Sequence, residues 1–159
     1  MRVVVMGVSG SGKTTVGQAV AERLGIPFYD GDDFHSKENK EKMHRGVPLT
    51  DADRAPWLAA IADFLKGKTD WVLACSALKA AYREVLNIGD DIRFVYLKGS
   101  EEVLEKHLRE RHGHFFNPHL LKSQLATLEE PTDAYVIDCN QSIEKLINEV
   151  VTLLTRIRD

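Results

Sequence analysis

The stretch that decides the expected fold is Gly7-Val8-Ser9-Gly10-Ser11-Gly12-Lys13-Thr14. It matches the pattern G-x-x-x-x-G-K-[ST], in which a glycine-rich backbone wraps an anion with its N–H groups. In this pattern the lysine, Lys13, reaches the β- and γ-phosphates of a nucleotide, and the hydroxyl of Thr14 ligates Mg²⁺. The sequence therefore predicts a nucleoside triphosphate site. The residues expected to hold the nucleotide are Gly7, Ser9, Gly10, Ser11, Gly12, Lys13, Thr14 and Thr15.

The residues on either side agree with a phosphate loop, which must follow a buried strand and open a helix. The strand-like run Arg2-Val3-Val4-Val5-Met6 precedes the loop, and Val16, Val20, Ala21 and Leu24 follow it at helical spacing. The alternative is a glycine- and serine-rich turn with an unrelated lysine, and this flanking pattern disfavours it.

Strand and helix patterns alternate along the rest of the chain. Further strands are expected near 26–29, 71–75, 92–97 and 134–137, and helices near 34–44, 79–86, 100–112 and 119–128. One more helix carries Trp57, Leu58, Ile61, Phe64 and Leu65 on one face, with Asp51 or Asp53 as its cap, and a closing helix begins near Ile143. The alternation predicts an α/β fold with a parallel β-sheet and helices on both faces. Ligands of such sheets bind beyond the carboxyl ends of the strands.

Composition restricts the class of function. The 159 residues, 43% hydrophobic and 28% charged, predict a single domain spanning 1–159. A net charge of −3 provides no basic field for nucleic acid, so we expect no nucleic-acid partner. The apolar run at 3–8 is too short to span a bilayer and lacks the features of a secretory signal, so we expect no membrane and a cytoplasmic location. Cys75 and Cys139 are expected to be reduced and buried.

An acidic cluster at 30–33 follows the predicted second strand. Asp32, just past the strand end, is suited to accept a hydrogen bond from a substrate hydroxyl and then its proton. Asp30 is a candidate for holding a metal-bound water. The alternative is that these carboxylates only cap the helix that follows, and this alternative is strongest for Asp33.

Beyond the phosphate loop, several segments carry a more specific pattern. They are 30–35, 39–43, 46–58, 75–79, 82–83, 113–115, 123–124 and 128–131. Together they resemble the gluconate kinase (gluconokinase) family over nearly the whole chain. The resemblance implies a P-loop three-layer fold like that of shikimate kinase and the nucleoside monophosphate kinases. It also implies ATP- and Mg²⁺-dependent phosphorylation of gluconate to 6-phosphogluconate, and a homodimer.

The resemblance also implies an acceptor site. Arg54 and Arg83 are expected on helices that flank it, where their guanidinium groups would grip the carboxylate of a sugar acid. His35 is a candidate hydrogen-bond partner of a hydroxyl, or else a surface histidine near a helix start. Lys79, which can share a helix face with Arg83, is a substrate ligand or a structural residue. His114 and Gln124 are further candidate substrate ligands.

The resemblance implies a lid at about 107–125 that closes over ATP. Arg111 is the candidate that stabilises the transferred phosphate, and Arg109 is a weaker one. His107 stands where we expect an arginine, so this stabilisation could depend on pH, or His107 could simply pack. Ser36 stands where the family usually carries proline, which predicts a slightly more flexible loop.

Two further loops bear on metal and base binding. The strand at 71–75 ends in cysteine rather than aspartate, so a metal would depend on Thr14, the phosphates and waters held by Asp30 or Asp32. The segment 138–141 joins the last strand to the last helix, where related kinases place adenine, and is a candidate base-binding loop.

The sequence disfavours two other functions. A kinase of shikimate or of a nucleoside monophosphate is disfavoured by the segments 46–58 and 75–83. A nucleotide switch without an acceptor would read guanine with Asn-Lys-x-Asp after an apolar strand. The chain's Asn39-Lys40 pair is instead followed by Glu41-Lys42 in an expected helix, which argues against a switch.

Overall fold

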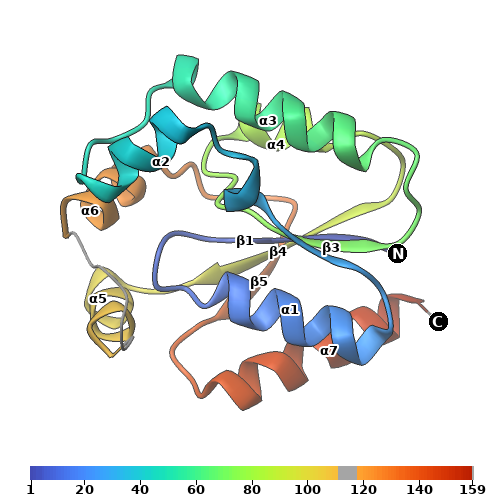
Figure 1. Cartoon of the computed structure of the whole chain (residues 1–159). Helices are drawn as coiled ribbons and strands as arrows, with labels where there is room; N and C mark the ends of the chain where they lie inside the picture. Colours follow the sequence, from blue (N-terminus) through green and yellow to red (C-terminus); the bar gives the residue numbers. More distant parts are fainter. Residues whose placement is uncertain (111–117, 159) are drawn as a thin grey trace.

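The centre of the fold is a five-stranded parallel β-sheet, seen edge-on in Figure 1. The computed structural model describes residues 1–110 and 118–158. The strands are β1 (Arg2–Met6), β2 (Phe28–Asp30), β3 (Trp71–Ala74), β4 (Ile92–Lys98) and β5 (Tyr135–Asp138), in the order β2-β3-β1-β4-β5. Because β1 and β3 have a strand on either side and helices above and below, nearly every residue in them is apolar and buried.

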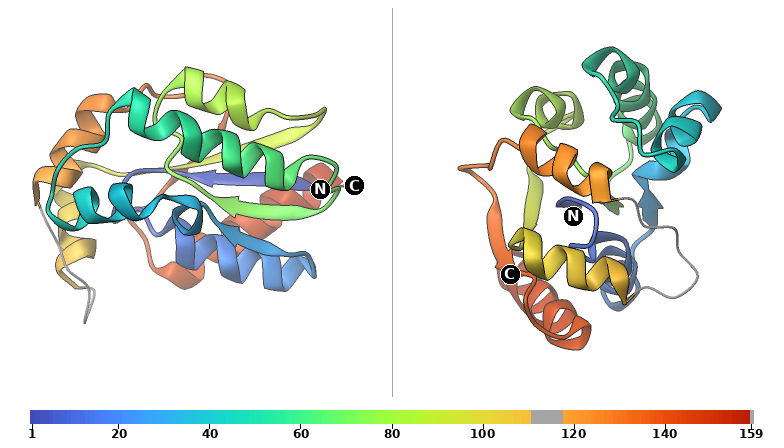
Figure 2. Two further views of the ribbon diagram at one scale, coloured as in Figure 1. Left: turned by 45° about the horizontal axis from the view of Figure 1, so that its top comes forward. Right: turned by 90° about the vertical axis from the view of Figure 1, so that its left-hand side faces the viewer.

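Helices cover both faces of this sheet. Figure 1 shows α1 (Lys13–Leu24) and α7 (Ile143–Arg158) below it, and α3 (Asp51–Leu65) and α4 (Ala80–Leu86) above it. The helices α2 (Lys37–His44), α5 (Glu101–Arg109) and α6 (Pro118–Thr127) gather toward one end of the sheet, as the right-hand view of Figure 2 shows for α5 and α6. The predicted three-layer α/β fold is confirmed. None of the described helices is long and apolar enough to cross a bilayer.

The core of α3 follows the predicted apolar pattern except at Phe64. On α3, Trp57, Leu58, Ile61 and Leu65 are buried, but Phe64 is 40% exposed. Phe64 lies at the rim, where its ring meets that of Tyr29 edge to face at 4.8 Å. Both cysteines are free and buried, as predicted.

Two helix starts differ from the expected ones. The N-cap of α3 is Thr50: its hydroxyl accepts from the N–H of Asp53, and the Asp53 carboxylate accepts from the N–H of Thr50, both at 3.0 Å. Asp53 therefore takes part in the cap, whereas Asp51 is the first helical residue. Ser36 is the N-cap of α2 and accepts from the N–H of Asn39 at 3.1 Å, so this serine stabilises a helix start.

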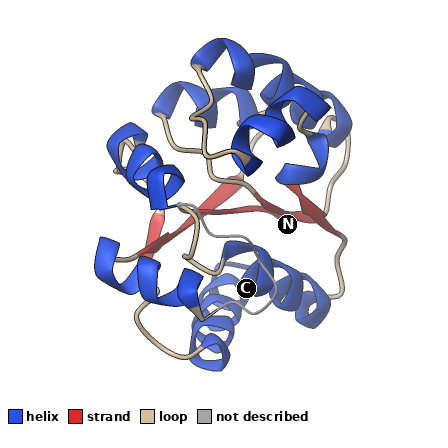
Figure 3. Ribbon diagram, turned by 60° about the vertical axis from the view of Figure 1, so that its left-hand side comes forward, coloured by secondary structure: helices blue, strands red, loops and turns tan. Residues whose placement is uncertain are grey.

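The parallel sheet brings five loops to one edge. The phosphate loop (residues 7–14) follows β1, a short 3₁₀ helix at Gly31–Phe34 (η1) follows β2, and the segment 75–79 follows β3. The turns after β4 and β5 open at the same edge, and Figure 3 shows the loops converging there. Segments distant in sequence therefore meet where a parallel sheet binds its ligands.

Candidate functional site

A cavity of about 460 Å³, here called the loop cavity, opens over the phosphate loop. Ser9, Gly10, Gly12, Lys13, Thr14 and Thr15 line its floor. Gly10 and Gly12 have φ of 86° and 89°, a left-handed conformation that favours glycine. A Cβ on Gly10 would lie 2.5 Å from the carbonyl oxygen of Leu104, so glycine also allows α5 to approach the loop.

The loop cavity is built to hold an anion. Gly12 caps α1 without a side-chain hydrogen bond, and a helix leaves the N–H groups of its first turn, here Lys13, Thr14 and Thr15, without partners inside the helix. These groups and the positive end of the helix dipole favour phosphate. Gly7 and Ser11 are not among the lining residues. Ser11 is buried behind them, and its N–H donates to the carbonyl of Val8 at 3.2 Å.

The residues around Lys13 and Thr14 fit a magnesium ion that depends largely on phosphate oxygens and water. Among the described residues, no group of three or more histidines, cysteines or acidic residues could hold a metal. Mg²⁺ in kinases commonly uses one or two protein ligands, and Thr14 and Asp32 both line the loop cavity. Burial raises the pKa of the Cys75 thiol to about 12, and Cys75 is not among the residues that line the loop cavity.

Asp30 has a structural partner. Its carboxylate caps η1 by accepting from the N–H of Asp32 at 3.0 Å, and Asp30 does not line the loop cavity. Desolvation by burial, with the charges of Asp32 and Asp33, raises the pKa of Asp30, although its backbone hydrogen bond opposes the shift. The predicted role of Asp30 toward a metal-bound water stays a prediction.

The far wall of the loop cavity comes from α5 and the start of α7. His107 donates from Nδ1 to the carbonyl oxygen of Gly10 at 2.9 Å, so it contacts the phosphate loop directly. Glu110 and Gln141 also line this wall, together with Ile143, which is 41% exposed. Of the base-binding segment predicted at 138–141, only Gln141 lines the loop cavity.

A second, smaller cavity of about 190 Å³, here called the Arg54 cavity, adjoins the first. It is lined by residues from the phosphate loop, η1 and its C-cap, α2, the turn before α3, α3 itself, the segment after β3 and α6. The residues that line both cavities are Ser9, Lys13 and Asp32. One cation and one carboxylate thus stand on the common wall, where a group held in one cavity can meet a group held in the other.

Arg54 supplies the buried cation of the second cavity. It is 8% exposed, and its Nη1 donates to the carbonyl of Leu49 at 2.9 Å and to the hydroxyl of Tyr82 at 3.3 Å. No ion pair joins Arg54 to a carboxylate within the described residues. The guanidinium therefore keeps its charge and its remaining donors for an anionic ligand.

His35 lies beside Arg54 in a fixed orientation. Its ring stacks on Trp57 with centroids 4.1 Å apart, and the indole N–H of Trp57 donates to the carbonyl of Gly31 at 2.7 Å. The Asn39 amide donates to Nδ1 of His35 at 3.2 Å, so the neutral ring carries its proton on Nε2. Desolvation lowers the pKa of His35. A neutral donor therefore lines the cavity, where a hydroxyl can accept from it.

Gln124 joins α6 to the phosphate loop. Its side-chain oxygen accepts from the N–H of Ser9 at 2.7 Å, and it lines the Arg54 cavity. Arg111 and His114 lie outside the described residues, as does the central part of the predicted lid. Arg109, the weaker lid candidate, pairs with Glu105 at 2.8 Å on the exposed face of α5.

The structure does not bring Arg83 or Lys79 into the lining of either cavity. Arg83 donates from Nη1 to the carbonyls of Ala77 (2.7 Å) and Leu78 (3.1 Å) and from Nη2 to that of Glu129 (2.9 Å). Ala77 has φ of 47°, a strained value for a residue with a side chain, and Arg83 braces this turn. Lys79 is the N-cap of α4 and donates to Asp51 at 2.9 Å.

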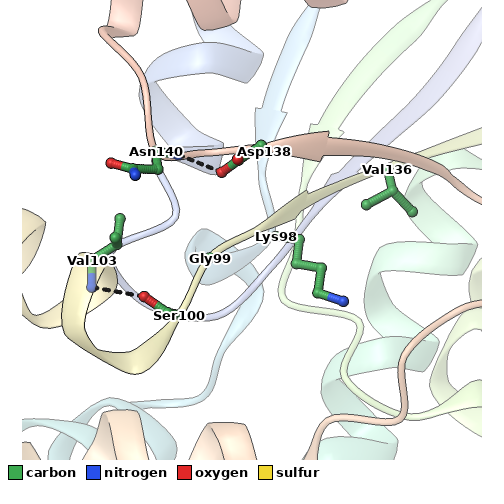
Figure 4. Close-up of a pocket in the computed structure, with 7 residues that line it drawn as sticks. All are labelled: Lys98, Gly99, Ser100, Val103, Val136, Asp138 and Asn140. Atoms are coloured by element: carbon green, nitrogen blue, oxygen red, sulfur yellow. Dashed lines mark hydrogen bonds between the residues drawn. The ribbon is translucent and has the colours of Figure 1, made fainter.

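A third hollow, of about 560 Å³, lies beside the ends of β4 and β5 (Figure 4). Asp138 and Asn140, both from the predicted base-binding segment, line this hollow instead of the loop cavity. The Asp138 carboxylate accepts from the N–H of Asn140 at 2.8 Å, a local turn bond. Lys98, also on its wall, pairs with Glu130. These contacts are structural, and the hollow contains none of the phosphate-loop residues.

Sequence reasoning overlooked several lining residues. Trp57 was predicted only as part of the α3 core, and Ser76, Ser123 and Glu110 were not singled out. A tryptophan on a buried helix face is a usable signal, because a buried indole N–H needs an acceptor and therefore approaches polar backbone. Single serines carry no such signal.

Comparisons with known proteins agree with this geometry. The family model described as "Shikimate kinase" matches residues 9–155. The chain is 43% identical to the thermoresistant gluconokinase of Escherichia coli, over 96% of this chain and 93% of that protein, and 54% identical to the gluconokinase of Gluconobacter oxydans, over 82% and 76%. A crystal structure of a gluconokinase from Sinorhizobium meliloti superposes with a TM-score of 0.91 at 45% identity, covering 98% of this chain and 92% of that one.

Proposed function

The chain belongs to the gluconokinase family, and we propose that it transfers the γ-phosphate of ATP to the terminal hydroxyl of gluconate. In this proposal the loop cavity holds the triphosphate and the Arg54 cavity holds the acceptor. The volumes suit these roles. The loop cavity, at about 460 Å³, is the larger of the two and takes the nucleotide, and the Arg54 cavity, at about 190 Å³, takes a six-carbon acid. The products are ADP and 6-phosphogluconate.

The observation that carries the proposal is the wall common to both cavities. Lys13 and Asp32 line the loop cavity and the Arg54 cavity alike. Phosphoryl transfer requires little covalent chemistry from the protein but demands that the attacking hydroxyl and the γ-phosphate be aligned. A cation and a carboxylate between the two ligands meet this demand.

Each group on the wall has a chemical role in the transfer. Asp32 accepts a hydrogen bond from the attacking hydroxyl, orients it and takes its proton as the new P–O bond forms. Lys13 and the N–H groups of the first turn of α1 stabilise the charge on the phosphate oxygens. Mg²⁺, which the Thr14 hydroxyl would hold, supplies further charge neutralisation on the phosphates.

The acceptor is recognised through its charge and its hydroxyls. The donors of Arg54 that face the cavity bind the carboxylate of gluconate, and the Nε2–H of His35 donates to a hydroxyl oxygen. Trp57 holds the His35 ring flat against it and so fixes the direction of that donor. The roles of Arg111 and His114, a lid at about 107–125, a homodimer and a cytoplasmic location belong to the same proposal and rest on the family resemblance.

The first experiment measures ADP release with Mg²⁺-ATP and four acceptor conditions: gluconate, shikimate, a panel of nucleoside monophosphates, and no acceptor. We expect rapid release with gluconate alone. Release at the same rate without an acceptor would identify an ATPase or switch and refute the proposal. Release with shikimate in preference to gluconate would move the chain to another kinase specificity.

A variant tests the acceptor site within this function. Because Arg54 is the buried cation of its cavity, Arg54→Ala should raise the gluconate KM by about thirtyfold or more and leave the ATP KM near normal. Arg45→Ala, at the exposed end of α2, is the matched control and should change neither constant. A normal gluconate KM in Arg54→Ala would exclude Arg54 as the carboxylate ligand.

A further inference from the structure

We infer that Tyr82 is a positioning residue for gluconate recognition: its hydroxyl, anchored by Asp51, holds the Arg54 guanidinium in place while keeping the Asp51 carboxylate away from it. This inference rests on the proposed function of Arg54. It adds residues that line neither cavity to the machinery of acceptor binding.

A continuous chain of polar contacts leads from the cavity to the surface. Nη1 of Arg54 donates to the Tyr82 hydroxyl at 3.3 Å, and that hydroxyl donates its own proton to the Asp51 carboxylate in a short hydrogen bond. Lys79 donates to the two oxygens of Asp51 at 2.9 and 3.2 Å. Tyr82 therefore orients Arg54, Asp51 orients Tyr82, and Lys79 in turn orients Asp51.

Tyr82 can fix the orientation of Arg54 because it is buried and contacts the guanidinium group. Its side chain is only 6% exposed, and the Arg54 guanidinium carbon lies 5.5 Å from the centroid of its ring. Desolvation and the hydrogen bond to Asp51 raise the pKa of the Tyr82 hydroxyl, so it remains a neutral phenol. A neutral hydroxyl can accept from Arg54 and donate to Asp51 at once, because it has one proton and free lone pairs.

The tyrosine also serves as a spacer between opposite charges. A carboxylate bound directly to Arg54 would occupy the donors that a sugar acid needs and would neutralise the guanidinium. Asp51 instead satisfies Lys79 and Tyr82, and these two hydrogen bonds, that from Tyr82 first, lower the pKa of Asp51. The Asp51 charge therefore interacts with groups outside the cavity, and the positive charge of Arg54 stays available to the substrate.

The test is a double-mutant cycle on Arg54 and Tyr82. We expect Tyr82→Phe, which deletes only the hydroxyl, to raise the gluconate KM about tenfold while kcat stays within about threefold and the ATP KM is unchanged. In an Arg54→Ala background the same change should shift the gluconate KM by less than about twofold, because the residue it positions is gone. Tyr96→Phe, which removes the hydroxyl of a similarly buried tyrosine on β4, should leave all three constants near wild type.

The outcomes separate the inference from the proposed function. If Arg54→Ala raises the gluconate KM but Tyr82→Phe does not, the positioning role is wrong and the proposed acceptor site stands. If Tyr82→Phe acts equally in both backgrounds, its effect is structural and the inference is wrong. A normal KM in Arg54→Ala overturns the carboxylate role and the inference together.

A second variant covers the case in which Tyr82→Phe does not fold. Asp51→Asn alters an exposed side chain and removes the charge that anchors the Tyr82 hydroxyl. It should raise the gluconate KM about threefold in the wild-type background and not in the Arg54→Ala background. Equal effects in the two backgrounds would overturn the inference.

Discussion

The loop cavity and the Arg54 cavity meet at Lys13 and Asp32, yet they are built in different ways. The floor of the loop cavity comes from one short stretch of the chain, in which every residue from 9 to 15 except Ser11 lines the cavity and which opens α1. The Arg54 cavity is lined by residues from several elements, which range from the phosphate loop through η1, α2 and α3 to α6 and span residues 9–124. Chemistry common to many kinases therefore resides in a local motif, whereas selection of the acceptor depends on how distant elements pack.

The difference has a consequence for mutations. Replacing a group on the common wall should affect the transfer itself, because both ligands meet there. Replacing a group deep in the Arg54 cavity should affect recognition of one ligand only. Replacing Arg83, which lines neither cavity and donates to three backbone carbonyls, should appear first as lost stability.

The largest effect is expected at Lys13. Lys13→Ala removes a cation from the common wall, and kcat should fall by about a thousandfold, because such a donor stabilises charge that grows in the transition state. The far-ultraviolet spectrum and the unfolding temperature should stay near wild type, since the side chain lines a cavity. Lys66→Ala, at the exposed end of α3, is the control. Wild-type activity in Lys13→Ala would refute the common wall as the reaction centre.

The next largest effect is expected at Asp32, and the neighbouring residue Asp33 provides a matched control. Asp32→Asn keeps the shape of the side chain but cannot take a proton, so kcat should fall by about a hundredfold with both KM values within about threefold. Asp33→Asn, which is also exposed on η1 but lines neither cavity, should leave kcat unchanged. Equal losses in the two variants would mean that the acidic cluster acts through its total charge or through helix capping.

Much of the fold could be predicted because its signals are local. The buried strands are apolar runs, the helices repeat their apolar residues every three or four positions, and the phosphate loop has one dominant structure. The cap of α3 was predicted at Asp51 or Asp53 and lies at Thr50. Three neighbouring residues can all cap, and backbone angles that the sequence does not display decide among them.

The acceptor side was less predictable, because its side chains are directed by tertiary packing. Arg54 and Arg83 look equivalent as arginines on helices, yet Arg54 lines its cavity and Arg83 donates to three carbonyls behind it. The turn at Ala77 creates those carbonyl positions, and a positive φ at a residue other than glycine is not foreseeable from the sequence. Tyr82 shows no pattern that reveals its contact with Arg54.

The structural role of Arg83, in contrast to the binding role of Arg54, can be measured as a change in the free energy of unfolding. Arg83→Ala removes three hydrogen bonds and leaves the buried carbonyl of Ala77 without its donor, although the Leu78 carbonyl still accepts from the N–H of Glu129. The free energy of unfolding should fall by about 3 kcal/mol in a urea titration. Arg93→Ala, which breaks a partly exposed ion pair with Asp91, should cost less than about 1 kcal/mol. An Arg83→Ala protein of normal stability with a raised gluconate KM would instead support Arg83 as a carboxylate ligand.

The smallest expected effect is on stability and concerns His35, the neutral donor of the Arg54 cavity, in contrast to the cation Arg54. Desolvation lowers the pKa of His35 below its ordinary 6.5. As pH falls through 6.5, the unfolded chain takes up a proton at this residue before the folded protein does. His35 should therefore contribute stability that is complete above about pH 6.5 and is lost as pH falls toward the folded pKa, by at most about 1.4 kcal/mol per pH unit.

Unfolding titrations at about pH 7.5 and about pH 5.5 should show a smaller loss of stability for His35→Gln than for the wild type, because glutamine does not titrate. An NMR titration of the His35 ring checks the cause directly, with an expected midpoint below 6.5. A midpoint at or above that value would refute the lowered pKa, and a midpoint above the pH of the assay would mean that the ring is charged when gluconate binds. The Arg54 cavity would then hold two cations, and its selectivity would follow from charge alone instead of from one cation and one neutral donor.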